Sequence, residues 1–339
     1  MPPILAFPDL DGMRYPELDR LSLRRIATGP EAALTLPQVD RADVRVLMTS
    51  ASRGCSAALV AALPALELVV SQGAGQEKID RGALSARNIR LRSVGEAVTD
   101  DVADLALTMT HMLLRDLIRA DRFARSGDWA KGRFAVTESA VGKVIGIAGL
   151  SGRIGQAIAT RARASRMRIA GLDRPSNQGL QAQLHPDLPT LAEASDILVL
   201  ALPGSAELTH LVNADVIARL GPKGVLVNVA RGNLVDTQAL IAALETGALG
   251  AAGLDVLEAE PEVPARLAAL PNVVLTPHVG AQTWGQRARA SAIAEAEIED
   301  MARLIRRMRD ELNLAVVWIE HAVGTLLKHV ERVIVLHQG

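Results

Sequence analysis

A glycine-rich turn between an apolar run and an amphipathic segment constrains the fold of this chain more than any other feature. Residues 144–148 are uniformly apolar, Gly149-Leu-Ser-Gly152-Arg-Ile-Gly155 follows, and residues 153–164 place apolar side chains at helical spacing. Glycine permits the sharp bend, the close approach of a pyrophosphate and tight packing of helix on strand. The helix N-terminus then offers free N–H groups to phosphate oxygens. The turn therefore predicts a dinucleotide-binding domain.

The spacing of this turn is one residue longer than usual. The usual pattern is G-x-G-x-x-G, whereas this chain has G-x-x-G-x-x-G with Ser151 as the extra residue. We expect the insertion to loosen cofactor binding, and a plain strand–helix turn without a ligand is the alternative. Asp173 lies eighteen residues beyond Gly155 and ends the next apolar run. A carboxylate there accepts hydrogen bonds from the adenosine ribose, which favours the dinucleotide interpretation.

The rest of the chain alternates short apolar runs with helical segments, which is typical of parallel α/β proteins. Strands are expected before the turn at residues 4–7, 44–49 and 68–71. One helix is expected at residues 56–63 and one long helix at residues 100–127. Later strands are expected at residues 167–172, 197–201, 225–229, 250–257 and 273–275. A length of 339 residues favours two domains.

Composition excludes several classes of function. The net charge of -1 gives no reason to expect a nucleic acid or an anionic membrane as partner. The single cysteine, Cys55, excludes an intramolecular disulfide and a cysteine zinc cluster, and no metal site is expected. No run of 18 apolar residues and no signal-peptide pattern occurs, so we expect a cytoplasmic protein.

Three polar side chains each follow an apolar run downstream of the turn: Arg231, Glu260 and His278. Parallel strands bring such residues to the ligand-binding edge of a sheet. Arginine binds a carboxylate by forked hydrogen bonds, histidine donates a proton near neutrality, and a neighbouring carboxylate favours charged imidazole. Together they suit the reduction of a 2-keto acid. Alone, each also fits an ordinary role, as a solvated arginine, a loop acid before proline, or a satisfied histidine.

From about Val44 to about Arg289 the chain resembles the D-isomer-specific 2-hydroxyacid dehydrogenases, most closely their bacterial glyoxylate/hydroxypyruvate reductase branch. The most specific stretch runs from Leu220-Gly-Pro-Lys-Gly-Val-Leu-Val-Asn-Val-Ala-Arg-Gly232 to Leu275-Thr-Pro-His-Val-Gly280. The resemblance implies an α/β fold of two Rossmann-like domains with a cleft between them. The flavodoxin-like substrate domain is expected at residues 1–98 plus 283–305, and the doubly wound NAD(P)-binding domain at 99–282.

The resemblance also implies an activity and its residues. The expected reaction is NAD(P)H-dependent reduction of small 2-keto acids, such as glyoxylate or hydroxypyruvate, to D-2-hydroxy acids. Arg231, Glu260 and His278 are the implied catalytic set, with His278 as acid/base. The substrate carboxylate is expected to bind Arg231 and the backbone N–H groups of Ala74 and Gly75.

Further positions are implied around the cofactor. They are Thr99, Gly149, Gly152, Arg153, Ile154, Gly155, Asp173, Arg174, Ala230, Asp255, His278 and Gly280. Arg153 and Ile154 are expected to face the pyrophosphate, Ala230 the nicotinamide and Asp255 its carboxamide. Trp129 matches the dimer arm of the reductase branch, which implies a homodimer.

Two neighbouring residues bear on the choice of cofactor. Asp173 argues for NAD(H), because its carboxylate repels the 2′-phosphate of NADP(H). Arg174 could still meet that phosphate. We expect NAD(H), with NADP(H) possible.

The chain ends unlike the family, with residues 306–339 as a foreign tail. The sequence from Leu304 resembles the switch-histidine region of an ABC-transporter ATPase of the branched-chain amino acid type, with His321 at the switch position. No G-x-x-x-x-G-K-[ST] phosphate loop occurs in the chain, so ATPase activity is not expected. A fusion or assembly join and a private extension are both open explanations.

Two other functions compete with the reductase. One is an NAD(H)-sensing binding protein on the same fold, because a fold does not fix a function. The other is an inactive fusion product. Oxidation of NADH that depends on a keto acid would distinguish the reductase from both.

Overall fold

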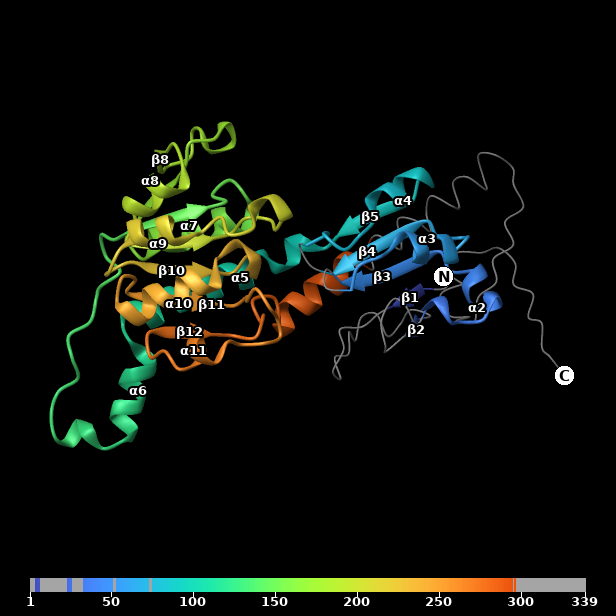
Figure 1. Cartoon of the computed structure of the whole chain (residues 1–339). Helices are drawn as coiled ribbons and strands as arrows, with labels where there is room; N and C mark the ends of the chain where they lie inside the picture. The colour runs from blue at the N-terminus through green and yellow to red at the C-terminus, as the bar shows by residue number, and fades with distance from the viewer. Residues whose placement is uncertain are drawn as a thin grey trace. The chain divides into compact units, whose positions relative to one another are not determined.

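The computed structural model describes residues 4–6, 23–25, 33–50, 53–72, 75–294 and 296 (Figure 1). The chain divides into two compact units. The first unit runs through Ala97 and resumes at Trp284, and the second unit is Val98–Thr283. The tail at 306–339, with His321, lies outside the described residues.

The first unit contains a parallel sheet whose described strands have the order β2-β1-β3-β4-β5. The strands are β1 (Ile4–Ala6), β2 (Leu23–Arg25), β3 (Val46–Ser50), β4 (Leu68–Gln72) and β5 (Arg90–Ser93). The helices are α2 (Gln38–Ala42), α3 (Ala57–Ala62) and α4 (Arg81–Ala86). This is the flavodoxin-like strand order. Leu47, Leu59 and Val69 share its buried core.

The second unit contains a larger parallel sheet, in the order β12-β11-β10-β9-β6-β7-β8 among the described strands. The strands are β6 (Val144–Ala148), β7 (Arg168–Leu172), β8 (Gln183–His185), β9 (Ile197–Leu200), β10 (Val225–Asn228), β11 (Ala251–Leu254) and β12 (Val273–Leu275). The strand order reverses between β6 and β9, where Gly146 lies opposite Leu198. Ligands of doubly wound folds bind at the carboxyl ends of strands beside such a switch point.

Helices cover both faces of this sheet, so its central strands are buried and read as continuous apolar runs. The helices are α5 (Thr99–Leu114), α6 (Leu117–Arg125), α7 (Arg153–Ala164), α8 (Leu188–Glu193), α9 (Ala214–Leu220), α10 (Thr237–Thr246) and α11 (Ala265–Ala268). One core joins α8, α9 and α10 to the sheet. A second core, on the opposite face, joins α5 and α7 to it.

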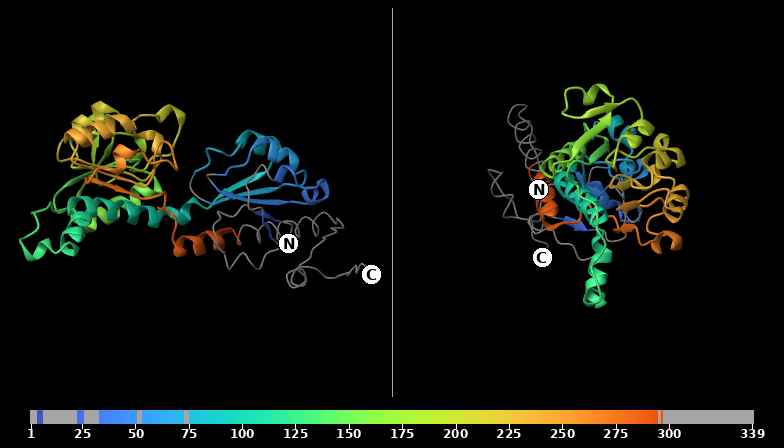
Figure 2. Two further views of the ribbon diagram at one scale, coloured as in Figure 1. Left: turned by 60° about the horizontal axis from the view of Figure 1, so that its bottom comes forward. Right: turned by 90° about the vertical axis from the view of Figure 1, so that its left-hand side faces the viewer.

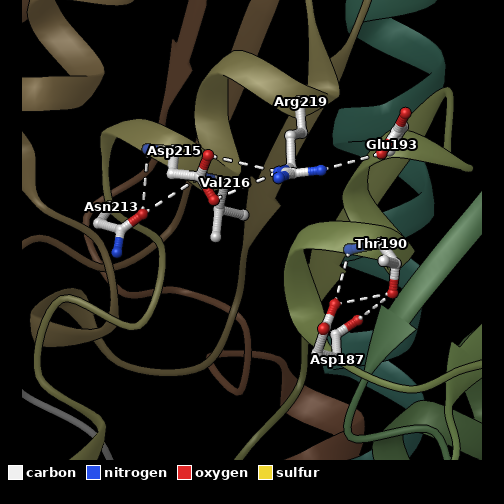
Figure 3. Close-up of polar contacts among 7 residues, drawn as sticks. All are labelled: Asp187, Thr190, Glu193, Asn213, Asp215, Val216 and Arg219. Carbon is white, nitrogen blue, oxygen red and sulfur yellow. Dashed lines mark hydrogen bonds and ion pairs between the residues drawn. The ribbon is translucent and has the colours of Figure 1, made fainter.

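Short polar side chains fix the ends of the helices on one of these faces (Figure 3). The Asp187 carboxylate caps α8 by accepting from Thr190 N–H at 2.9 Å. The Asn213 side chain caps α9 by accepting from the N–H groups of its first turn. Arg219 of α9 pairs with Glu193 of α8 at 3.0 Å. These contacts set the spacing of two neighbouring helices over the sheet.

The long helix expected at residues 100–127 is wrong, because the segment is two helices. α5 ends at Leu114 and α6 begins at Leu117, with Asp116 between them in the left-handed region at φ 48°. The apolar spacing carries no glycine or proline at this point, so nothing in the sequence marked the break. α6 buries none of its residues and projects from its own unit (Figure 2).

Candidate active site

The glycine turn accommodates its extra residue without losing the helix start. Gly152 N–H donates to the Gly149 carbonyl at 3.0 Å, which closes a tight turn around Ser151. Gly149 has a φ of 101°, a conformation that favours glycine, and a Cβ at Gly155 would collide with the Gly149 carbonyl. α7 begins directly at Arg153 and has no side-chain cap. Its first N–H groups are therefore not used by a cap from the chain itself.

Asp173 directly follows β7, the neighbour of β6, as the sequence predicts for a ribose-binding carboxylate. Its Oδ1 accepts from the Gln178 side chain at 2.5 Å. The guanidinium of Arg174 donates to the carbonyls of Asp173 and Pro186 at 3.1 and 3.4 Å. The carboxylate is thus held by a side chain five residues on, while the neighbouring cation bonds to backbone.

Arg231 lies three residues beyond the end of β10, and its position is set by the turn that precedes it. The Asn228 side chain accepts from Ala230 N–H at 3.0 Å and donates to the Arg231 carbonyl at 2.9 Å. The Arg231 guanidinium donates to the Ala230 carbonyl at 2.7 Å. A Cβ at Gly204 would press on the aliphatic stem of Arg231. The absent side chain at Gly204 therefore gives Arg231 its space.

His278 and Glu260 meet after β12 and β11 respectively. His278 Nδ1 lies 2.9 Å from Glu260 Oε2, and Glu260 Oε1 accepts from Leu257 N–H at 3.0 Å. A carboxylate only accepts, so Nδ1 carries the proton of this bond. The other ring nitrogen, Nε2, is then the one that can exchange a proton with a substrate.

Asp255 holds the turn that carries His278. Its Oδ1 accepts from the Thr276 hydroxyl at 2.6 Å and Val279 N–H at 2.8 Å, and its Oδ2 accepts from Gly280 N–H at 2.9 Å. His278 itself has a φ of 53°, in the left-handed region that costs a non-glycine residue energy. The hydrogen bonds that Thr276, Val279 and Gly280 donate to Asp255 hold His278 in this conformation.

The environment shifts the two members of the pair in opposite directions. The hydrogen bond with Glu260 raises the pKa of His278, and it outweighs partial burial and the nearby positive charge of Arg231. Burial raises the pKa of Glu260, but hydrogen bonds from His278 and Leu257 N–H outweigh burial and leave this pKa below its ordinary value. The pair therefore favours a charged imidazolium beside an ionised carboxylate near neutral pH.

Other predicted positions lie in both units. Thr99 begins α5 in the second unit, and its hydroxyl is buried without a hydrogen-bond partner among the described residues. Ala230 is buried beside Arg231, and Gly280 is buried against Asp255. Gly75 is buried in the first unit, whereas Ala74 lies outside the described residues.

Sequence reasoning missed Gly204, which lies against Arg231, and Glu258, two residues before Glu260. Gly204 escaped it because only the collision with Arg231 shows its importance. Glu258 was not predicted because a functional role was assigned only to Glu260, two residues later in the same loop. Its oxygens contact His210 and Thr237 at 2.7 and 2.8 Å. No sequence pattern connects these three positions.

Comparison with known families identifies the chain. Residues 107–280 match the NAD binding domain of D-isomer specific 2-hydroxyacid dehydrogenases. Over 280 residues the chain is 42% identical to glyoxylate/hydroxypyruvate reductase A of Arabidopsis thaliana, covering 83% of this chain and 89% of that protein. The chain belongs to the D-isomer specific 2-hydroxyacid dehydrogenase family. The family predicted from the sequence is confirmed.

Two further relatives widen the comparison. Hydroxyphenylpyruvate reductase of Plectranthus scutellarioides is 42% identical over 268 residues, which are 79% of this chain and 85% of that protein. A crystal structure of the NADPH-dependent glyoxylate/hydroxypyruvate reductase of Sinorhizobium meliloti, with NADP and malonate, matches with a TM-score of 0.75. It is 37% identical and covers 86% of this chain and 90% of that one. The predicted oxidoreductase class and Rossmann-like α/β fold are confirmed.

The residues of this family member fit a nicotinamide dinucleotide. The turn after β6 contains three glycines, so no side chains fill the space where a pyrophosphate would bind. The N-terminus of α7 has no side-chain cap, and its first N–H groups point outward from the helix end. The unpartnered Thr99 hydroxyl is a further polar group that a ligand would satisfy. In the described part of the chain no cluster of side chains suits a metal ion, and no helix is long and apolar enough to cross a membrane.

Proposed function

We propose that this dehydrogenase reduces small 2-keto acids of the glyoxylate and hydroxypyruvate type to D-2-hydroxy acids, with NAD(P)H as reductant. The observation that carries the proposal is the contact of 2.9 Å between His278 and Glu260, with Arg231 on the adjacent strand end. The named activities of the Arabidopsis and Sinorhizobium relatives support the same class of substrate.

In this proposal Arg231 binds the substrate carboxylate and orients the keto group toward His278. A guanidinium suits this role because its planar fork matches a carboxylate. The aliphatic stem of Arg231 is confined by Gly204, and its backbone is held by Asn228. A cation held in this way binds the substrate with little loss of side-chain freedom.

His278 is the proposed acid. Its Nε2–H donates a proton to the carbonyl oxygen while the C=O π bond breaks and a C–H bond forms at the keto carbon. The reduced nicotinamide, when bound, supplies the hydride for that bond. The raised pKa of His278, caused by its hydrogen bond with Glu260, keeps this proton available near neutral pH. After the transfer the imidazole is neutral, and its Nδ1–H still donates a hydrogen bond to Glu260.

NADH is the proposed preferred reductant. The Asp173 carboxylate is held by Gln178 beside the turn after β6, and a fixed negative charge there repels a 2′-phosphate. One guanidinium nitrogen of the neighbouring Arg174 donates to backbone carbonyls. D173A is expected to weaken NADH binding and to narrow the difference between NADH and NADPH, as measured by quenching of protein fluorescence.

A homodimer is proposed from the segment that follows α5. α6 buries nothing within its unit, and Trp129 is 71% exposed just after it. Val136 and Val141 are also exposed on the same segment. Sedimentation of the full chain and of W129S tests this proposal, because a monomeric wild type at micromolar concentration would contradict it. The cytoplasmic location stays a prediction from the sequence.

The first experiment measures oxidation of NADH and NADPH with glyoxylate, hydroxypyruvate and hydroxyphenylpyruvate, in the full chain and in H278A. Turnover is expected with NADH and the two smaller acids, and H278A is expected to lose about 10²–10⁴-fold in kcat. Binding of NADH is measured in the same samples. A folded wild type that binds NADH without turnover would favour the sensing protein, and one that does neither would favour an inactive fusion.

A further inference from the structure

A second histidine–carboxylate pair lies beside the proposed catalytic pair. Glu258 Oε1 is 2.7 Å from His210 Nε2, and Glu258 Oε2 accepts from the Thr237 hydroxyl at 2.8 Å. These residues come from three places: the loop after β11, the segment after η5 (Ala206–Leu208), and the first turn of α10. Both oxygens of the Glu258 carboxylate therefore contact side chains from other parts of the second unit.

The same loop holds Glu260. Leu257 N–H donates to Glu260 Oε1 at 3.0 Å, and the next residue is Glu258. A Cβ at Gly232 would collide with the Leu257 carbonyl, so the backbone after Arg231 packs directly on this loop. This packing fixes the loop at Leu257, whose N–H group orients the Glu260 carboxylate.

We propose that Glu258, held by His210 and Thr237, is a positioning residue that keeps the Glu260 carboxylate against His278. This inference rests on the proposed function, in which His278 delivers the proton. The role is indirect, because the side chains that Glu258 binds are His210 and Thr237 and not the proposed catalytic residues. Its effect passes along the backbone from Glu258 to Leu257 and so to Glu260.

Charge explains why a histidine is useful at position 210. Glu258 and Glu260 are two carboxylates separated by one residue. His278 pairs with Glu260, and a positively charged His210 offsets the negative charge of Glu258. The hydrogen bond with Glu258 raises the pKa of His210, and the charge of Asp236 at the N-cap of α10 acts in the same direction. The hydrogen bond from His210 lowers the pKa of Glu258, against the effect of its burial.

The positioning therefore has a pH dependence of its own. As pH rises through the raised pKa of His210, the imidazole loses its positive charge and its contact with the Glu258 carboxylate weakens, while the Thr237 bond remains. Glutamine at position 210 keeps an N–H donor and cannot titrate. The structure thus offers three graded variants. E258A removes the carboxylate, H210A removes the donor, and H210Q keeps a donor but removes the charge and its titration.

The test measures the pKa of His278 by recording the NMR signals of its ring as a function of pH. The spectrum of H278A assigns these signals. In E258A and H210A the pKa of His278 is expected to fall, because Glu260 is less firmly held. H210Q keeps a donor to Glu258 but has no charge, so it is expected to lower the pKa of His278 less than H210A does. H111A is the matched control, since His111 bonds to Ser165 away from this loop. Circular dichroism confirms that each variant is folded.

Kinetics supply the second measurement. E258A and H210A are expected to lose about tenfold in kcat with little change in the KM of the keto acid or in NADH binding. Unfolding of E258A would leave H210A and H210Q as the deciding pair. An unchanged His278 titration in folded H210A and E258A would overturn the proposal. The NMR titration needs no turnover, so a chain that lacks reductase activity would fail the proposed function without deciding this inference.

Discussion

Replacing Asp255 by asparagine tests whether this carboxylate holds the turn that carries His278. Asp255 is 3% exposed and accepts hydrogen bonds from Thr276, Val279 and Gly280. In D255N one oxygen becomes an NH₂ group that faces Gly280 N–H, so two donors oppose each other. An unsatisfied buried donor costs about 1–3 kcal/mol, and the remaining bonds lose their charge assistance. We expect a loss of about 3 kcal/mol in the free energy of unfolding.

Calorimetry of the full chain measures this loss. At about 2–4 °C per kcal/mol, the unit Val98–Thr283 is expected to melt roughly 6–12 °C lower in D255N. D187N is the matched control, because Asp187 is an exposed cap of α8 and asparagine caps a helix about equally well. An unchanged melting temperature in D255N would refute the reasoning. Equal losses in D255N and D187N would assign the effect to lost charge alone.

Three further predictions concern the site. E260Q keeps a neutral oxygen that can accept from His278 Nδ1–H but removes the carboxylate charge, so the pKa of His278 should fall. Because the protonated imidazole is the proposed acid and is lost as pH rises through that pKa, the rate of reduction should begin to decline at a lower pH than in the wild type. A decline at the wild-type pH would contradict this. G204A should displace the Arg231 stem and lower kcat/KM for glyoxylate by up to about 10²-fold with unchanged NADH binding, as steady-state kinetics would show. Deletion of Ser151 should tighten NADH binding measured by fluorescence titration; equal or weaker affinity would show that the longer turn does not loosen the site.

The elements that the sequence predicted well are those with a strong local signal. β6 is an unbroken apolar run followed by glycine, and both of its faces are covered by helices. β5 was missed because its residues, Arg90 to Ser93, are mostly polar, and its strand state comes from pairing with β4 at the sheet edge. Edge strands often carry such charges. The break at Asp116 was missed because neither glycine nor proline marks it in the sequence.

The site divides in the same way. Arg231, Glu260 and His278 could be predicted because each ends or follows an apolar run, and the carboxyl ends of parallel strands share one edge. The structure brings Glu260 and His278 into contact, and their catalytic roles stay predictions. The contacts of Glu258 with His210 and Thr237 join residues that are 48 and 21 positions apart in the sequence. Only folding makes them neighbours, so no local pattern could reveal them.

The position of α5 has a consequence for the order in which the ribosome delivers this protein. α5 opens the unit Val98–Thr283, yet it packs on β10, β11 and β12, which are synthesised last. Met109 and Leu113 lie directly against Gly253 of β11. α7 follows early in the unit and packs on α5, but the part of α5 that faces these three strands stays uncovered until most of the unit is translated. His278 is made just after β12, so the proposed acid and the last strand that packs on α5 are synthesised almost together.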